Sequence, residues 1–423
     1  MPKKLSIGTV ITTVEQWLML PDVDVVRVVL AAVIANRLAG DSLWLFVIAP
    51  PGGGKTELLN ALGGAPDIYP LSDLTPQTFL SGKQGDSDAS LLPKLSDTIL
   101  ILKDFTTVLT MHRDARQQVL AQLREIYDGS YIKAFGTGKI LRWQGKVGFI
   151  AGVTPVIDHH HAVSQVLGER FIQFRLAAGD GKAIARSAMR HRGREREMRA
   201  ALRDIFAAFL AARTAPDLHP VEIPEAVEDA IADLAVLVVR ARSGIIRDAF
   251  STREIELVPE PEAPTRLAKQ LATFAVSVAL VEDAATVTPG HLALVARLAL
   301  DCIPRPRFLA LRHLAGRGAP ETTSVIAGMI DYPTSSTRRV LEDLAALGVL
   351  VVQKAGPGRP DLWRVADAFG EVFRAALARA SGTLPEVSEG HNTLPLLPPS
   401  DISGKVVDSP ETVPYGSGRD ADA

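Results

Sequence analysis

Short apolar runs alternate with helical patterns over the first half of the chain. The runs 43–49, 98–104 and 146–154 are rich in aliphatic residues and are too short to form typical helices. Buried strands that alternate with helices are typical of a parallel sheet covered by helices. The pattern therefore predicts an α/β core with a parallel sheet over residues 41–180, preceded by an N-terminal helical segment, residues 1–40.

The second half of the chain shows mainly helical periodicity. Residues 181–304 read as a helical lid region that is helical almost throughout, with breaks at the prolines of 216–224 and 259–264. Residues 305–370 carry three helical patterns and then two strand-like runs around a Gly- and Pro-containing turn, which is the outline of a winged helix. The Pro-, Gly- and Ser-rich stretch 381–423 predicts a disordered tail.

Composition limits the kind of protein that these elements can build. The chain has 423 residues, 47% hydrophobic and 22% charged, with a formal net charge of −2, which fits a soluble protein of two or three domains. The single cysteine, Cys302, excludes an intramolecular disulfide. We expect a cytoplasmic location and no membrane partner, because no long apolar run or leader pattern is present. The charge excludes a uniformly basic protein that coats nucleic acid.

A phosphate loop is the strongest chemical signal. The segment 49–56 follows an apolar run and precedes a helical pattern, although Ala49 stands where a glycine is usual. Glycines let backbone amides surround phosphates, the lysine reaches the β- and γ-phosphates, and the hydroxyl binds Mg²⁺. The segment therefore predicts binding of ATP with Mg²⁺, by Pro51, Gly52, Gly53, Gly54, Lys55, Thr56 and Glu57.

An acid at the end of a second strand completes such a site. Asp104 ends the run 98–104 and is expected to hold Mg²⁺ together with Thr56. Phe105 follows it, where many ATPases of this type carry a glutamate that polarises water. Either the base comes from elsewhere, with Glu125 and Asp128 as candidates, or hydrolysis is slow.

The order of these motifs resembles the AAA+ ATPases. The residues that carry the resemblance are the phosphate loop, the Asp104 strand, 152–155 (Gly-Val-Thr-Pro) and 167–171 (Leu-Gly-Glu-Arg-Phe), and it covers most of residues 40–370. Within the family, the chain looks like the clade with a hairpin before the sensor strand, in particular the minichromosome-maintenance-like helicases of bacterial mobile elements. The resemblance implies an AAA+ P-loop core, a helical lid, a C-terminal winged helix and a homo-oligomeric ring, a hexamer.

Three further site residues follow from this resemblance. It implies that Thr154 reads the γ-phosphate, that Arg170 reaches into the neighbouring subunit's site, and that Arg266 contacts the phosphates from the lid. The alternatives are a surface ion pair for Arg170 and a solvated side chain for Arg266.

Two segments are candidates for DNA contact. Alternating runs around Gly-Thr-Gly at 136–138 predict a β-hairpin, which the resembling helicases point into the ring's pore. Lys133 and Lys139 would neutralise phosphates and Phe135 would stack or wedge, whereas the alternative is an ordinary edge that packs on the core. In the winged-helix region the candidates are Arg338, Arg339, Lys354 and Arg359, and the alternative there is protein docking.

These observations favour an ATP-dependent, ring-forming DNA translocase or helicase for replication of a mobile element. The runner-up is a nucleotide-switched, DNA-binding AAA+ regulator or loader with weak hydrolysis, which the missing glutamate favours. A third hypothesis is a transcription factor in which the winged helix is the principal site.

Overall fold

A five-stranded parallel sheet forms the centre of the first half of the chain. Its strand order is β2-β3-β6-β1-β7, and every neighbouring pair is parallel. The strands are β1 (Trp44–Ile48), β2 (Ile68–Leu71), β3 (Thr98–Leu102), β6 (Val147–Val153) and β7 (Phe171–Arg175). All residues of β1 and β6 are buried, as expected for strands covered on both faces. The predicted α/β core with a parallel sheet is confirmed.

The computed structural model describes residues 4–80, 90–135, 140–160, 170–177, 179–215, 218–248 and 253–381. All of them belong to a unit that spans Met1–Asn392. The predicted disordered tail lies outside the described residues, apart from its first residue.

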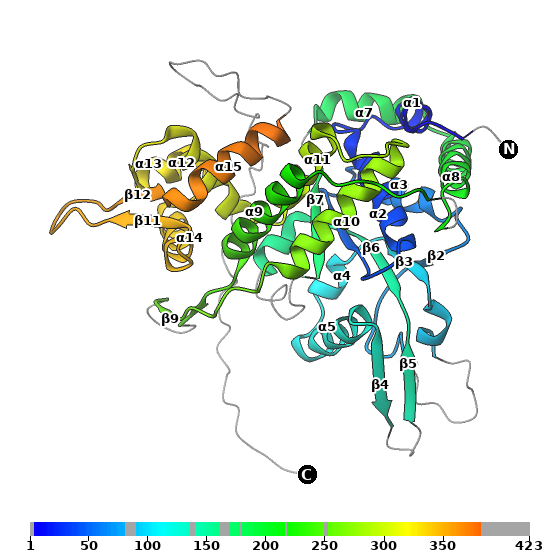
Figure 1. The fold of residues 1–423 in the computed structure, drawn as a ribbon, viewed down its shortest axis with the longest axis horizontal. Coiled ribbons are helices and arrows are strands. Elements are labelled where there is room, and N and C mark those ends of the chain that lie inside the picture. The colour runs from blue at the N-terminus through cyan, green and yellow to red at the C-terminus, as the bar shows by residue number, and fades with distance from the viewer. Residues whose placement is uncertain are drawn as a thin grey trace, which may run out of the picture. The chain divides into compact units, whose positions relative to one another are not determined.

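Helices cover the two faces of the sheet (Figure 1), and the side chains packed on the two faces differ. The helices of the first half are α1 (Ile7–Trp17), α2 (Asp24–Arg37), α3 (Lys55–Leu62), α4 (Thr106–Leu109) and α5 (Arg113–Tyr127), with short 3-10 turns η2 (Leu92–Leu95) and η3 (Pro155–His160). One face packs aliphatic residues of α2 and α3 with the later helices. The other face packs aromatic rings beneath α4 and α5, where Phe46 stacks on Phe171 at 3.8 Å between ring centroids.

The lid region is mainly helical, as predicted, but it also contains a short antiparallel pair of strands. The helices are α7 (Gly181–Arg190), α8 (Glu195–Ala211), α9 (Glu225–Arg242), α10 (Thr265–Val281) and α11 (Pro289–Asp301), and the strands are β8 (Ile246–Arg247) and β9 (Ile255–Leu257). These two short strands were not predicted. Arg247 pairs with Asp343 at 2.7 Å, about 100 residues away, and such a tertiary contact leaves no local signal.

A small C-terminal module follows the lid. It consists of α12 (Arg305–Arg317), β10 (Glu321–Thr322), α13 (Thr323–Ile330), α14 (Thr334–Ala346), β11 (Leu350–Gln353), β12 (Leu362–Val365) and α15 (Asp367–Ala380). Its three strands form an antiparallel sheet in the order β10-β12-β11. The three predicted helices and the two predicted strands are confirmed, whereas β10 and α15 were not predicted.

Among the described helices, none combines the length and the apolar character that crossing a bilayer requires.

Candidate functional site

The phosphate loop joins the buried strand β1 to α3. Gly52 and Gly54 adopt positive φ angles of 78° and 81°, a region that glycine enters without steric cost. Gly54 is also the N-cap of α3, and no side chain caps the helix there. The first backbone amides of α3 are therefore available for an anion, which the positive end of the helix dipole also favours.

Lys55, the first residue of α3, lies across this loop. It is only 6% exposed, and its Nζ lies 3.2 Å from the carbonyl oxygen of Ala49 and 3.4 Å from that of Pro50. Burial lowers the pKa of Lys55, while the negative charge of Asp104 acts in the opposite direction. The ammonium group is thus held by two neutral carbonyl oxygens, so a bound phosphate would gain a strong electrostatic interaction.

Asp104 and Thr154 follow the neighbouring strands β3 and β6, and Thr106 holds both in place. The amide of Thr106 donates to Asp104 Oδ1 at 2.9 Å, and the amide of Thr154 donates to Thr106 Oγ1 at 3.2 Å. Parallel strands end at one edge of the sheet, here called the carboxyl edge. Lys55, Asp104 and Thr154 therefore share that edge. The role of Thr106 was not predicted. The sequence pattern that could have indicated it is a hydroxyl residue two positions after Asp104.

Gly152, near the end of β6, allows the close approach of β3 beneath Lys55. A Cβ atom at Gly152 would lie 2.5 Å from the carbonyl oxygen of Lys103 and 3.3 Å from Cδ of Lys55. A contact of 2.5 Å is shorter than Cβ atoms make in proteins, so β3 or β6 would have to move.

The variant Gly152→Ala is therefore expected to destabilise the fold by about 1–3 kcal/mol, typical of overpacking, and to weaken ATP binding. Thermal unfolding and titration with a fluorescent ATP analogue measure the two effects. The matched control is Gly328→Ala in α13, where a new Cβ meets nothing within 4 Å. Wild-type stability and affinity in Gly152→Ala would contradict this account of the edge.

The polar groups at the carboxyl edge would fit a magnesium ion bound together with a nucleotide's phosphates. Mg²⁺ in such sites takes one or two protein oxygens and completes its shell with phosphates and water. Asp104 is half-buried with Oδ1 bonded to Thr106, and the exposed Thr56 follows Lys55 at the start of α3. Glu57, in contrast, pairs with Arg199 of α8 at 2.8 Å, which holds its carboxylate toward that helix.

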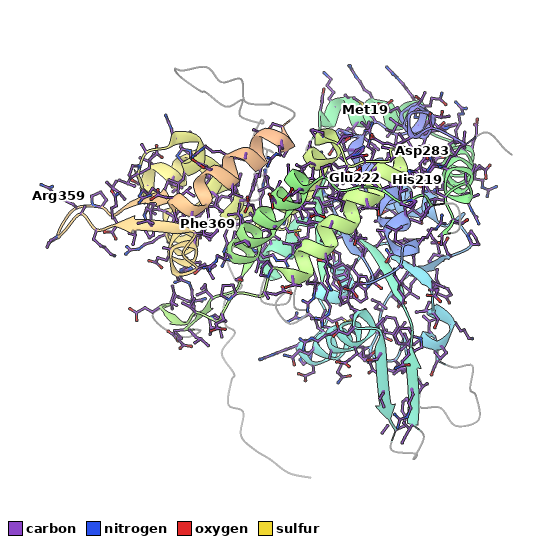
Figure 2. All side chains as sticks on the ribbon, in the orientation of Figure 1. Met19, His219, Glu222, Asp283, Arg359 and Phe369 are labelled. Carbon is purple, nitrogen blue, oxygen red and sulfur yellow. The ribbon has the colours of Figure 1, made fainter. Side chains whose placement is uncertain are left out.

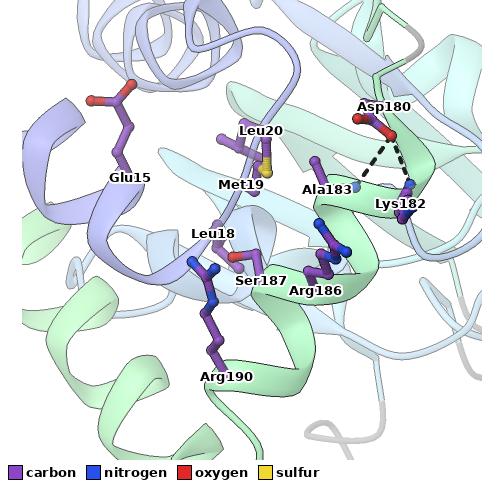
Figure 3. A pocket seen from close by; sticks show the side chains of 10 residues that line it. All are labelled: Glu15, Leu18, Met19, Leu20, Asp180, Lys182, Ala183, Arg186, Ser187 and Arg190. Atoms are coloured by element: carbon purple, nitrogen blue, oxygen red, sulfur yellow. Dashed lines mark hydrogen bonds between the residues drawn. The ribbon is translucent and has the colours of Figure 1, made fainter.

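A cavity of about 570 Å³ lies between the segment 18–20 and α7 (Figure 3). Leu20 of this segment also contacts the loop, since a Cβ at Gly54 would lie 3.0 Å from Leu20 Cδ2. The volume is within the range of small-molecule pockets. The cavity is lined by Glu15, Leu18, Met19, Leu20, Asp180, Lys182, Ala183, Arg186, Ser187 and Arg190. Sequence reasoning missed it because its two walls lie about 160 residues apart.

Arg170 lies at the start of β7, at the opposite edge of the sheet, here called the amino edge. Its guanidinium pairs with Asp128 at 2.6 Å and lies 5.4 Å from the centre of the Tyr127 ring. The arginine side chain is 6% exposed, whereas that of Asp128 is 47% exposed. Solvent therefore reaches the ion pair on the side of the Asp128 carboxylate. The ion pair considered as the alternative for Arg170 is therefore present, with Asp128 as the partner.

Arg266 lies at the same amino edge. Gln270, one turn further along α10, donates to the Arg170 carbonyl oxygen at 2.7 Å and to the Tyr127 hydroxyl at 3.1 Å. Burial raises the pKa of Tyr127 to about 12, although the positive charge of Arg266 acts in the opposite direction. Arg266 itself forms an ion pair with Glu262. Both arginines are thus grouped around Tyr127.

The ring of Tyr127 marks the position of this group in the sheet. It packs edge-on against Trp44, the first residue of β1, with 5.2 Å between ring centroids. Lys55 lies beyond the other end of the same strand, after the loop that follows Ile48. The two predicted arginines are therefore separated from Lys55, Asp104 and Thr154 by the length of the strands.

The two candidates for a catalytic base also lie away from Asp104. Asp128 is bonded to Arg170, and Glu125 is exposed near the end of α5, where its charge raises the pKa of Tyr131, after burial as the larger cause. Both lie within two residues of Tyr127, which packs at the amino edge. Neither is placed beside the phosphate loop of its own chain.

The predicted hairpin consists of β4 (Ser130–Ala134) and β5 (Ile140–Gln144) and projects from the core (Figure 1). Lys133 and Phe135 share a face with the buried Trp143, and Lys133 Nζ lies 5.3 Å from the Phe135 ring centre. The opposite face exposes Ile132 and Ile140, at 63% and 57%. Lys139 lies outside the described residues.

The predicted DNA contacts of the C-terminal module differ in their surroundings. Arg338 pairs with Glu342 and Lys354 with Asp361, each at 3.0 Å. Arg339 is exposed, and Arg359 is exposed in the turn between β11 and β12 (Figure 2). Two of these four cations are therefore already neutralised by carboxylates of the same module.

Asp158 connects the carboxyl edge to this module. It belongs to η3, which directly follows Thr154, and its carboxylate binds the Arg175 guanidinium at 2.7 Å. Its Oδ1 also accepts from the backbone amide of Arg305, the first residue of α12, at 3.2 Å. The amide of Arg175 donates to Asp301 Oδ2 at 2.8 Å, and burial raises the pKa of Asp301 to about 6. Asp158 thus contacts both Arg175 at the end of β7 and the start of α12.

No family model matches this chain, and no curated protein is detectably similar to it.

Proposed function

We propose that the chain is an ATP-dependent DNA translocase or helicase that works as a ring, with an AAA+ P-loop core, a helical lid and a winged-helix C-terminal module. One observation carries the proposal. Lys55, Asp104 and Thr154 gather at the carboxyl edge of the sheet, whereas Arg170 and Arg266 gather around Tyr127 at the amino edge. A second copy can bring its amino edge to the first copy's phosphates, which one chain cannot do alone.

The residues of the carboxyl edge divide the work of holding ATP. The open amides of the loop and Lys55 bind the β- and γ-phosphates, and Thr154 orients the terminal phosphate. Thr56 and Asp104 hold Mg²⁺, which neutralises charge on the phosphate oxygens when it is bound. The cavity beside Leu20 receives the nucleoside, with Leu18, Met19 and Ala183 against the base.

The arginines supply charge across the subunit contact. A guanidinium beside the transferred phosphate stabilises the charge that develops during hydrolysis. Arg170 would exchange the Asp128 carboxylate for the neighbour's phosphate, and the exposed side of Asp128 makes this pair accessible. Hydrolysis then requires contact between copies, as a hexameric ring provides.

DNA contact is proposed for the projecting hairpin and the C-terminal module. The hairpin follows α5, whose last turn and the adjoining Asp128 contact Arg170, so its position depends on the subunit contact. Rearrangement at the contact between subunits would move the hairpin of one subunit relative to that of the next. This movement would carry a DNA strand through the pore of the ring. Replication of a mobile element is the biological role proposed from the resemblance.

The test is ATP turnover by the full chain with Mg²⁺, with and without single-stranded DNA, together with displacement of a labelled strand from a forked duplex. We expect DNA to raise turnover and the labelled strand to be released only with hydrolysable ATP. Turnover that ignores DNA, with no strand release, would overturn the motor function.

A nucleotide-switched DNA-binding regulator or loader is the second candidate, and Phe105 favours it. This residue follows Asp104, where a glutamate would polarise water, and it is fully buried among the aromatic rings. A regulator would assemble on binding ATP but turn it over slowly, at a rate that DNA does not change.

A further inference from the structure

One face of α12 carries two arginines around an aromatic ring. The Arg305 guanidinium lies 5.5 Å and that of Arg312 5.9 Å from the centre of the Phe308 ring. Positions three, four and seven apart share a helix face, which explains the grouping. All three side chains are half-buried, so they are held in place and still accessible to solvent.

The charge of these two arginines is poorly compensated. Burial lowers the pKa of Arg312, and the charge of Arg305 lowers it further, while no carboxylate in the described part of the chain acts in the opposite direction. Burial and the charge of Arg175 likewise lower the pKa of Arg305, against Asp301 and Asp158. Asp158 already pairs with the Arg175 guanidinium, and Asp301 already accepts from the Arg175 backbone amide.

Other arginines of α12 show the contrast. Arg307 pairs with Asp343 at 3.1 Å, and Arg317 lies 3.5 Å from Glu321. Among the residues that the structure describes, the Arg305 and Arg312 guanidinium groups have no comparable carboxylate contact. An anion from outside the chain would therefore be stabilised at this face, because it compensates two charges that repel each other.

Tyr332 extends this face toward α14. It is 36% exposed, and its phenol lies close enough to Arg305 for their charges to influence each other's pKa. Two guanidinium groups with a phenylalanine and a tyrosine ring beside them match the sugar-phosphate backbone and bases of a nucleic-acid strand.

We propose that Arg305, Phe308, Arg312 and Tyr332 form a binding site for a phosphodiester of a DNA strand, with the two guanidinium groups on one phosphate or on adjacent phosphates. The inference rests on the proposed DNA function and assigns the contact to α12 instead of the ion-paired Arg338 and Lys354. The backbone amide of Arg305 donates to Asp158, which follows Thr154 at the carboxyl edge. Through this bond the site would also move with the edge that binds ATP.

The test uses the full chain carrying Arg305→Gln and Arg312→Gln together, with Arg312→Gln alone and the control Arg317→Gln. Fluorescence anisotropy of a labelled single-stranded oligonucleotide is measured from low to high salt. We expect the double variant to bind at least about 10-fold more weakly and its salt slope to fall by about 1.4, which is 0.7 for each of two phosphates. Arg317→Gln should bind like the wild type.

Competition with inorganic pyrophosphate separates a DNA strand from a free polyphosphate as the ligand. The proposal expects DNA to be bound much more tightly than pyrophosphate at this site. The proposed site would be overturned if a folded double variant kept the wild-type DNA affinity and salt slope. It would also be overturned if the double variant lost binding of pyrophosphate but not of DNA. If the double variant unfolds, the DNA affinity of the single variant Arg312→Gln decides the question. This variant breaks no ion pair, since the Arg312 guanidinium contacts no carboxylate among the described residues. Failure of the proposed DNA function is distinct, because the wild type itself would then not bind DNA.

Discussion

Replacing Lys55 with alanine is expected to lower ATP turnover by about 10² to 10³-fold, the usual effect of removing one group that stabilises the transition state. The ammonium group is only 6% exposed and is held by the carbonyl oxygens of Ala49 and Pro50. Turnover is measured with the full chain and Mg²⁺. The control is Lys103→Ala, an exposed lysine beside Asp104.

The same variant also separates loss of function from loss of folding. Burial already lowers the pKa of Lys55, so removing its charge should cost the free protein little stability. We expect wild-type thermal unfolding without nucleotide, and no rise in melting temperature when ATP and Mg²⁺ are added, whereas the wild type should be stabilised. A Lys55→Ala chain that ATP stabilises as well as the wild type would show that the loop is not the phosphate site.

The second large effect is expected for Arg170→Ala, which should bind ATP but lose about 10³-fold or more of its turnover, as for other arginine fingers. Because Arg170 acts on a neighbour, mixing this variant with Lys55→Ala should restore turnover. Mixed contacts would then join an intact phosphate loop to an intact arginine. Neither variant alone can form such a contact.

The Asp128→Asn variant distinguishes the finger from a purely structural role of the ion pair. Both Asp128→Asn and Arg170→Ala break the 2.6 Å pair, but only the second removes the guanidinium. We expect Asp128→Asn to retain turnover and Arg170→Ala to lose it. Equal losses in the two variants, together with no recovery on mixing, would mean that Arg170 only holds β7 to α5.

Local patterns were sufficient to predict the central elements of the fold and of the phosphate site. The loop at 49–56, the strand before Asp104 and the hairpin strands around 136–138 each depend on spacing within about ten residues. Such spacing reflects strand periodicity and glycine geometry, which the sequence shows directly.

Contacts between distant segments could not be predicted in this way. Arg170 bonds to Asp128 across 42 residues, and Gln270 bonds to Arg170 across 100 residues. The sequence implied roles for Arg170 and Arg266 through resemblance, but not that they would group at the amino edge. The cavity beside Leu20 and the arginine pair of α12 likewise depend on packing that no single segment determines.

The most direct test of the account is ATP turnover per chain, measured against chain concentration with saturating ATP and Mg²⁺, with and without single-stranded DNA. We predict that turnover per chain rises steeply as copies associate, because the arginines of one copy complete the phosphate site of the next. We also predict that DNA raises this turnover further. Turnover per chain that stays constant from the dilute monomer to the assembled state would contradict the claim that the site is shared between copies.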